Sequence, residues 1–177
     1  MSQYYVWDKI IPKVECERII DDCSNIEGCS NIETLYGGIG KIFVRLVGLD
    51  NLATKLIYGF AHEANDILFH YEIIDHEQMH FIEYTVDDRL QYHQDLVYEG
   101  TQVAPVRKLS VSVLLSDPQD FEGGEFEIYN GFNEPHKPLK GQGSIVVFDS
   151  RDYHAVTPVT SGVRYSLAMW ATGPLFK

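Results

Sequence analysis

Positive charge, cysteine and long apolar runs are all scarce in this 177-residue sequence, and each scarcity excludes a class of protein. The chain has 14 basic and 26 acidic residues, so its net charge is −12 and its pI lies near 4.9. This acidity argues against binding to a phosphate backbone, and we expect no nucleic-acid partner. An acidic surface provides solubility, and it would also favour a basic peptide or protein partner.

The signals that direct a chain to a membrane are missing as well. No apolar run is long enough to span a bilayer, and residues 1–8 lack the charged start and apolar core of a signal peptide. We therefore expect a cytoplasmic location and no membrane partner.

The three cysteines, Cys16, Cys23 and Cys29, are seven and six residues apart, which matches no zinc-binding signature. A reducing cytosol disfavours disulfides between them. Cys16 and Cys23 fall on one helical face, so we interpret them as small buried hydrophobic residues.

Apolar content is ample by comparison, with 45% hydrophobic and 12% aromatic residues, which is typical of an ordered globular protein. The length suits one domain covering residues 1–177, without a linker, repeat or low-complexity tract. We expect a helical support region over residues 1–67 and a β core over residues 68–177.

Two amphipathic helices are predicted in the support region, over about residues 13–26 and 51–67. Asp50 is the expected N-cap of the second helix. That helix carries one apolar stripe, which is expected to face the core and consists of Leu52, Leu56, Phe60, Ala64 and Ile67.

A period of two begins at residue 68 and persists through the β core. It predicts eight short strands separated by turn residues, as in a sandwich or jelly roll with helices packed outside. The strands are expected near 68–74, 78–86, 90–96, 107–116, 124–130, 143–149, 153–159 and 163–171.

The strand at 109–115 indicates which face of the sheet lies where. One face is wholly apolar and should pack on the helices, whereas the other carries Ser110 and Ser112 and should line a cavity.

His93 and Asp95 are two residues apart in an expected strand, so their side chains would converge on one face. One imidazole and one carboxylate leave a divalent metal short of protein ligands. His154, further along the chain, would complete the 2-His-1-carboxylate triad that holds non-haem Fe(II) with open positions. Arg164 follows ten residues after His154.

These residues, together with the strand 109–117, Phe121-Glu122-Gly123-Gly124-Glu125 and the segment 148–160, resemble the Fe(II)- and 2-oxoglutarate-dependent oxygenases. The similarity is to the prolyl 4-hydroxylase-like branch and its PKHD-type hydroxylases. The resemblance implies a mainly β double-stranded β-helix, or jelly roll, with supporting N-terminal helices. It also implies a hydroxylase that uses Fe(II), 2-oxoglutarate and O2 and releases succinate and CO2.

The resemblance further implies that His93, Asp95 and His154 bind the iron, and that Arg164 binds the distal carboxylate of 2-oxoglutarate. A guanidinium group matches a carboxylate with two parallel hydrogen bonds. Ser166, two residues further along the same strand, is expected to add a hydrogen bond.

Some residues depart from the family pattern. Leu114 stands where some members carry a tyrosine for the distal carboxylate, and Ser112 or Tyr84 is the candidate to replace that hydroxyl. Leu90 and Asp87 replace a usual aromatic residue and a usual glycine, which bears on the shape of the pocket.

Other residues near the expected cavity leave two readings open. Arg107 is a candidate substrate contact or a surface ion-pair residue, and Trp170 is expected in the core. The remaining histidines of the central region lack strand-paired spacing, so we expect surface or core positions for them: His62, His70, His76 and His80.

The substrate is expected to be a prolyl or other residue of a peptide or protein, with two loops, 97–106 and 130–140, at the cavity mouth. A free amino acid or other small metabolite is the alternative. A cupin-like metalloenzyme and a non-catalytic jelly-roll binding module also remain open.

Overall fold

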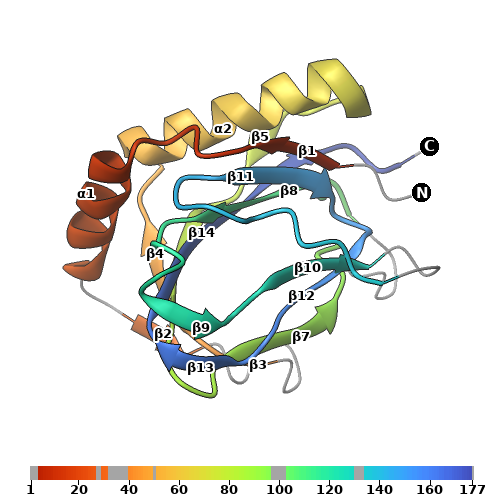
Figure 1. The fold of residues 1–177 in the computed structure, drawn as a ribbon. Coiled ribbons are helices and arrows are strands. Elements are labelled where there is room, and N and C mark those ends of the chain that lie inside the picture. The colour runs from red at the N-terminus through yellow and green to blue at the C-terminus, as the bar shows by residue number, and fades with distance from the viewer. Residues whose placement is uncertain are drawn as a thin grey trace.

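The computed structural model describes residues 4–26, 29–31, 40–49, 51–96, 103–129 and 134–176. Within them, antiparallel strands form one large and two smaller sheets (Figure 1). The large sheet has the order β1 (Tyr4–Trp7), β11 (Ile145–Asp149), β8 (Val106–Leu114), β14 (Arg164–Gly173), β6 (Met79–Tyr84), β4 (Phe43–Val47) and β2 (Cys29–Asn31), with β5 (Asp75–His76) also paired to β14. The four-stranded sheet has the order β10 (Phe126–Tyr129), β12 (Tyr153–Val156), β7 (Arg89–His93) and β3 (Gly40–Lys41), and β13 (Val159–Gly162) pairs with β9 (Phe121–Gly123).

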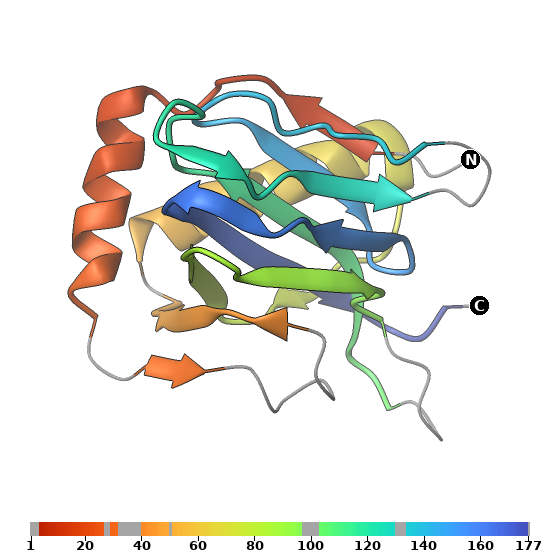
Figure 2. The same ribbon diagram turned by 60° about the horizontal axis from the view of Figure 1, so that its bottom comes forward.

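The four-stranded sheet lies in front of the large sheet, as Figure 2 shows. The two helices, α1 (Lys13–Ser24) and α2 (Leu52–Ala64), cover the outer face of the large sheet (Figure 1). This mainly β arrangement with helices outside is the jelly roll expected from the sequence.

Strand β8 separates the helix-facing core from the space between the sheets, as its sequence predicts. Its apolar face, including Leu109 and Val113, belongs to the same buried cluster as Ile57 and Ala61 of α2. The opposite face carries Ser110 and Ser112, which line the pocket between the sheets.

Helix α1 buries its two cysteines as predicted. Cys16 and Cys23 are 0% and 2% exposed, and both are free thiols. Burial raises the pKa of each thiol to about 11.

The predicted core stripe of α2 is correct only in part, because Ala64 is buried and Phe60 packs against the core, but the other three residues are exposed. Leu52 and Leu56 are exposed, as is Ile67 just after the helix, whereas Thr54, Ile57, Ala61 and Ala64 are the buried residues of the helix. Leu52, Leu56 and Phe60 line a groove beside α1.

The start of α2 also differs from the prediction, since Asp50 lies outside the described residues. Asn51 caps the helix, because its side-chain oxygen accepts a hydrogen bond of 2.8 Å from the backbone N–H of Ala53.

The strand predicted at 68–74 does not form. After α2 the chain continues in a π-helical turn, Asn65–Phe69, which ends at His70 with φ 57°. The Asn65 side chain then bonds both the backbone N–H and the C=O of Tyr71, at 2.8 and 2.9 Å. These bonds take the place of a strand neighbour for Tyr71.

The strand predicted at 153–159 is interrupted. Strand β12 ends at Val156, and β13 begins at Val159 in a different sheet. Pro158 lies between them, and it has no N–H to donate to a ladder.

Parts of the loops expected at the cavity mouth, residues 97–102 and 130–133, lie outside the described residues. Among the residues that are described, no helix is long and apolar enough to cross a membrane.

Candidate metal centre

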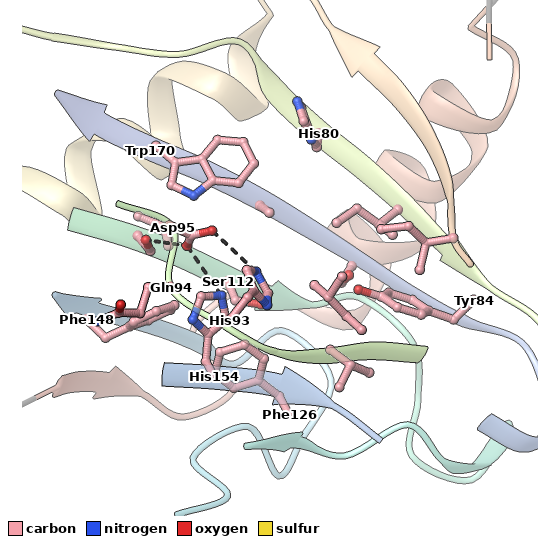
Figure 3. Close-up of a pocket in the computed structure, with 18 of the residues that line it drawn as sticks. His80, Tyr84, His93, Gln94, Asp95, Ser112, Phe126, Phe148, His154 and Trp170 are labelled. Atoms are coloured by element: carbon pink, nitrogen blue, oxygen red, sulfur yellow. Dashed lines mark hydrogen bonds and ion pairs between the residues drawn. The ribbon is translucent and has the colours of Figure 1, made fainter. Parts of the chain in front are cut away.

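His93 and His154 lie side by side because β7 and β12 are paired with these two residues in register. The strand predicted at 90–96 ends early, because β7 stops at His93, and Asp95 follows two residues later outside the strand. Its carboxylate oxygens lie 3.5 Å from Nε2 of His93 and 3.3 Å from Nε2 of His154. One ligand atom from each of the three residues lies within 4.8 Å of the others, and Figure 3 shows the side chains converging at one end of a pocket.

Backbone carbonyls orient both imidazole rings. Nδ1 of His93 lies 2.8 Å from the carbonyl oxygen of Gln91, and Nδ1 of His154 lies 3.1 Å from that of Asp152. A ring that donates its Nδ1–H to a carbonyl presents the lone pair of Nε2, which is the arrangement of a metal-binding histidine. Both Nε2 atoms are the ring atoms nearest to Asp95.

Asp95 is held ionised among cationic and polar neighbours. Its side chain is only 6% exposed, and burial by itself would raise the pKa of the carboxyl group. The interactions with His154, His93 and Arg107 outweigh burial and hold the pKa of Asp95 well below its usual range. The site therefore offers an anionic oxygen at any physiological pH.

Arg164 lies in the same pocket with unsatisfied donors. It is 1% exposed, and neither Nε nor Nη1 has a hydrogen-bond partner. Burial lowers the pKa of the guanidinium group, and the Tyr84 ring centroid lies 5.1 Å from the guanidinium carbon. A buried guanidinium with free donors is costly unless an anion pairs with it, so these atoms fit the carboxylate of a ligand.

The other residues expected around Arg164 line the same pocket, namely Tyr84, Ser112 and Ser166. Tyr84 pairs with Arg164 across strands β6 and β14, and Ser166 lies two residues after Arg164 on β14. Leu114 is buried and pairs with Ser166 across the strands. Tyr84 lies at the opposite end of the pocket from the triad, as Figure 3 shows.

The donor set fits Fe(II) and an anionic co-substrate. Two imidazole nitrogens and one carboxylate oxygen on one side of a pocket are the ligands of a non-haem Fe(II) triad, which leaves positions open. Arg164, further along the pocket, supplies the cation that the far carboxylate of a dicarboxylic co-substrate requires.

Arg107 forms an ion pair, which was one of the two alternatives, and its role as a substrate contact stays a prediction. It lines the pocket, and it forms a bidentate ion pair with Glu77 at 2.7 and 2.6 Å. Its guanidinium carbon also lies 3.8 Å from the ring centroid of Trp170. Trp170 is 7% exposed but lines the pocket, so it is a wall residue as well as a core residue.

His80 is a pocket residue that the sequence analysis assigned elsewhere. It contacts the Trp170 ring edge to face, with 4.8 Å between the centroids. Burial, assisted by the nearby charge of Arg107, lowers the pKa of His80 to about 4. The sequence did contain a signal for this position. His80, Ile82 and Tyr84 are two residues apart along β6, so their side chains point to the same side and line one wall of the pocket.

The other histidines of that region lie away from the pocket, as expected. His62 and His76 both contact the ring of Tyr58, and His70 ends the π-helical turn.

Comparison with known proteins gives independent information. The family described as "2OG-Fe(II) oxygenase superfamily" matches residues 79–172, just over half of the chain. A PKHD-type hydroxylase of Shewanella sp. (strain ANA-3) is 36% identical over 91 residues, which are 51% of this chain and 40% of that protein. The PKHD-type hydroxylase YbiX of Escherichia coli O9:H4 (strain HS) is 42% identical over 62 residues, or 35% of this chain and 27% of YbiX. The chain thus spans well under half the length of the curated relatives that it matches.

Solved structures resemble the fold over nearly the whole chain. A Pseudomonas putida prolyl-4-hydroxylase aligns with a TM-score of 0.72 at 16% identity, covering 97% of this chain and 93% of that one. A viral collagen prolyl hydroxylase from Paramecium Bursaria Chlorella virus-1, solved with 2OG, aligns with a TM-score of 0.73 at 18% identity and covers 96% of each chain. At such low identity these alignments establish the double-stranded β-helix fold alone. Since the family match covers just over half of the chain and includes the triad and Arg164, the chain belongs to the 2OG-Fe(II) oxygenase superfamily.

Proposed function

We propose that this protein is an Fe(II)- and 2-oxoglutarate-dependent hydroxylase whose iron ligands are His93, Asp95 and His154. The observation that carries the proposal is Arg164, a buried cation with unpaired Nε and Nη1 atoms in the same pocket as the triad. A pocket that only bound a metal would not need such a cation. A cupin-like enzyme or a plain jelly-roll binding module therefore accounts less well for it.

The pocket residues would have different roles, according to their positions along the pocket. The triad would hold the metal, and Arg164, with Ser166 and Tyr84 beside it, would anchor the distal carboxylate of 2-oxoglutarate. When bound, iron and 2-oxoglutarate together supply the oxidising chemistry that activates O2 and places one oxygen atom on a C–H bond, with succinate and CO2 as co-products. The apolar walls, including Phe126, would exclude water from the reaction.

The proposed substrate is a prolyl or other residue within a peptide or protein. The two arginines that line the described pocket are Arg107 and Arg164, and Glu77 already compensates the charge of Arg107. A free amino acid would bring its own carboxylate, which would compete with Glu77 for Arg107. A peptide carries no such charge at an internal residue. A prolyl hydroxylase of Trichoplax adhaerens with this fold was solved in complex with a peptide fragment (TM-score 0.75, 17% identity).

The cytoplasmic location and the single-domain organisation over residues 1–177 also remain predictions. The free thiols of Cys16 and Cys23 are compatible with a reducing compartment.

Anaerobic titration tests the metal assignment. Fe(II) plus 2-oxoglutarate should give a weak visible charge-transfer band in the wild type, and His93→Ala and Asp95→Ala should abolish it. His76→Ala is the matched control and should keep the band, because His76 contacts Tyr58 away from the pocket. A band that disappears in His76→Ala and persists in His93→Ala would show that the triad is misassigned.

Turnover assays test the substrate class. Proline-containing peptides and free amino acids are offered in parallel, and succinate and the product of 16 Da greater mass are quantified together. Coupled turnover on peptides alone is the expected result. Coupled turnover on a free amino acid alone would replace the peptide substrate and leave the hydroxylase assignment in place.

A further inference from the structure

The Asp95 carboxylate has a buried neighbour that is absent from the proposed ligand set. The Ser110 hydroxyl, on the cavity face of β8, donates a hydrogen bond of 2.6 Å to Oδ2 of Asp95. Ser150, which directly follows β11, lies behind it, with 2.9 Å between the two hydroxyl oxygens. Ser110 and Ser150 are 2% and 0% exposed.

The direction of these hydrogen bonds follows from proton counting. An ionised carboxylate only accepts, so the single hydroxyl proton of Ser110 is committed to Asp95. The contact between the two serines therefore requires Ser150 as the donor. The result is an ordered chain from Ser150 to Ser110 to Asp95.

A carboxylate in this position needs such a support. The last torsion of an aspartate side chain has a broad, roughly two-fold energy profile, so rotamer preference alone does not set the plane of its oxygens. Asp95 also lies beyond the end of β7, outside the strand ladder that fixes His93. Arg107 approaches from the other side, but its Nη1 atom is 3.8 Å from Oδ1, beyond hydrogen-bonding distance.

The backbone reinforces the same connection. The N–H of Leu96, the residue after Asp95, donates to the carbonyl oxygen of Ser150 at 2.9 Å, and the N–H of Ser150 donates to that of Lys108 at 3.1 Å. The segment that carries Asp95 is thus docked on the segment that carries Ser150, which is docked on β8.

We infer that Ser110 and Ser150 are positioning residues that set the orientation of the Asp95 carboxylate for metal binding, with Ser150 acting only through Ser110. This inference rests on the proposed metal site. Partners of metal ligands of this kind typically change metal affinity by 10–100-fold when they are removed.

The test measures the affinity of the apo protein for Co(II), together with the visible spectrum of the Co(II) complex. Ser110→Ala should weaken Co(II) binding by about 10–100-fold and alter the ligand-field bands. Ser150→Ala should have a smaller effect, because Ser110 can still donate to Asp95. The double variant should match Ser110→Ala, since Ser150 has no route to Asp95 without Ser110.

Ser116→Ala is the matched control. Ser116 is a buried serine just beyond the far end of β8, and its hydroxyl accepts a hydrogen bond of 2.6 Å from the backbone N–H of Tyr165. This variant should lose some stability and keep wild-type Co(II) affinity, which separates a general loss of packing from an effect on the carboxylate.

The outcomes also separate this inference from the proposed function. Wild-type Co(II) binding that requires His93, combined with unchanged affinity in Ser110→Ala, would overturn the positioning role alone. Additive effects of the two serine substitutions would overturn the ordered chain. No Co(II) binding by the wild type would overturn the metal site and this inference with it.

Discussion

Arg164 holds its charge where water is largely excluded, and its environment within the protein compensates that charge poorly. It is 1% exposed and has two unpaired donor atoms, so its partner is expected to arrive with the co-substrate. Breaking a buried charge pair costs about 3–5 kcal/mol, which corresponds to at least a hundredfold in affinity.

Arg164→Met should accordingly weaken 2-oxoglutarate binding by at least a hundredfold. Iron binding should persist, and the apo protein should be no less stable, because the variant removes an unpaired buried cation. Calorimetric titration and thermal unfolding with and without 2-oxoglutarate measure both effects. Arg89→Met, at an exposed arginine on β7, is the control. Unchanged 2-oxoglutarate affinity in folded Arg164→Met would remove this role from Arg164.

His80 should make the protein sensitive to mild acid. The pKa of His80 is about 4 in the folded state, against 6.5 for the unperturbed residue. Between these values the unfolded chain binds a proton that the folded protein does not, so stability falls as the pH drops through this window. The free energy of unfolding that is lost through His80 between pH 7 and pH 5 is at most about 2 kcal/mol.

His80→Leu removes this titration. The free energy of unfolding of the apo protein should therefore fall less between pH 7 and pH 5 in the variant than in the wild type, as measured by urea denaturation. Equal losses in both proteins would show that His80 is solvated in the native state.

At the scale of elements, the connection between β9 and β10 shapes the Arg164 end of the pocket. Gly124 has φ +60°, and a Cβ atom there would lie 2.9 Å from Cδ of Arg164 and 3.0 Å from Cγ2 of Val159. A side chain at this position would be strained and would displace the arginine.

Gly124→Ala should lower stability by about 1–2 kcal/mol and also weaken 2-oxoglutarate binding. Gly59→Ala is the same substitution at an exposed position inside α2, where a Cβ atom meets nothing within 4 Å. It should raise stability by about 1 kcal/mol and leave the affinity unchanged. Thermal unfolding and 2-oxoglutarate titration of the two variants check the contrast, which fails if Gly124→Ala binds like the wild type.

At the scale of the whole molecule, the buried thiols report on global unfolding. Cys16 and Cys23 belong to the core cluster that joins α1 to the large sheet, and burial raises the pKa of both to about 11. A thiol that is buried and protonated does not react with an alkylating reagent until it is exposed.

Iodoacetamide at pH 7.5 should therefore leave Cys16 and Cys23 unmodified in the native protein, and both should react in urea. Peptide mapping by mass spectrometry identifies the modified residues. Rapid modification of either cysteine without denaturant would mean that α1 detaches from the sheet in the native state.

The sequence by itself determined the parts of this protein that depend on local alternation. The two faces of β8 and the buried cysteines of α1 follow from periods of two and 3.6 residues, since these periods set the direction of each side chain. Asp95 lies beyond the end of β7, so the period of two alone does not bring its side chain to His93. The family match agrees with the fold and cofactor class expected from the motifs.

The tertiary structure decided what depends on which neighbour a residue meets. On α2 the core buries Ile57 and Ala61, which were not predicted, together with the predicted Ala64. Leu52 and Leu56, from the predicted stripe, are exposed. The Asn65 side chain forms hydrogen bonds with both backbone polar groups of Tyr71, and the strand predicted at 68–74 does not form.

The contact between the two serines beside Asp95 also depends on the tertiary structure. Ser110 and Ser150 are 40 residues apart in the chain and meet because β8 and β11 pair in the large sheet. No local pattern records such a contact, because it depends on the register between strands rather than on the period within one.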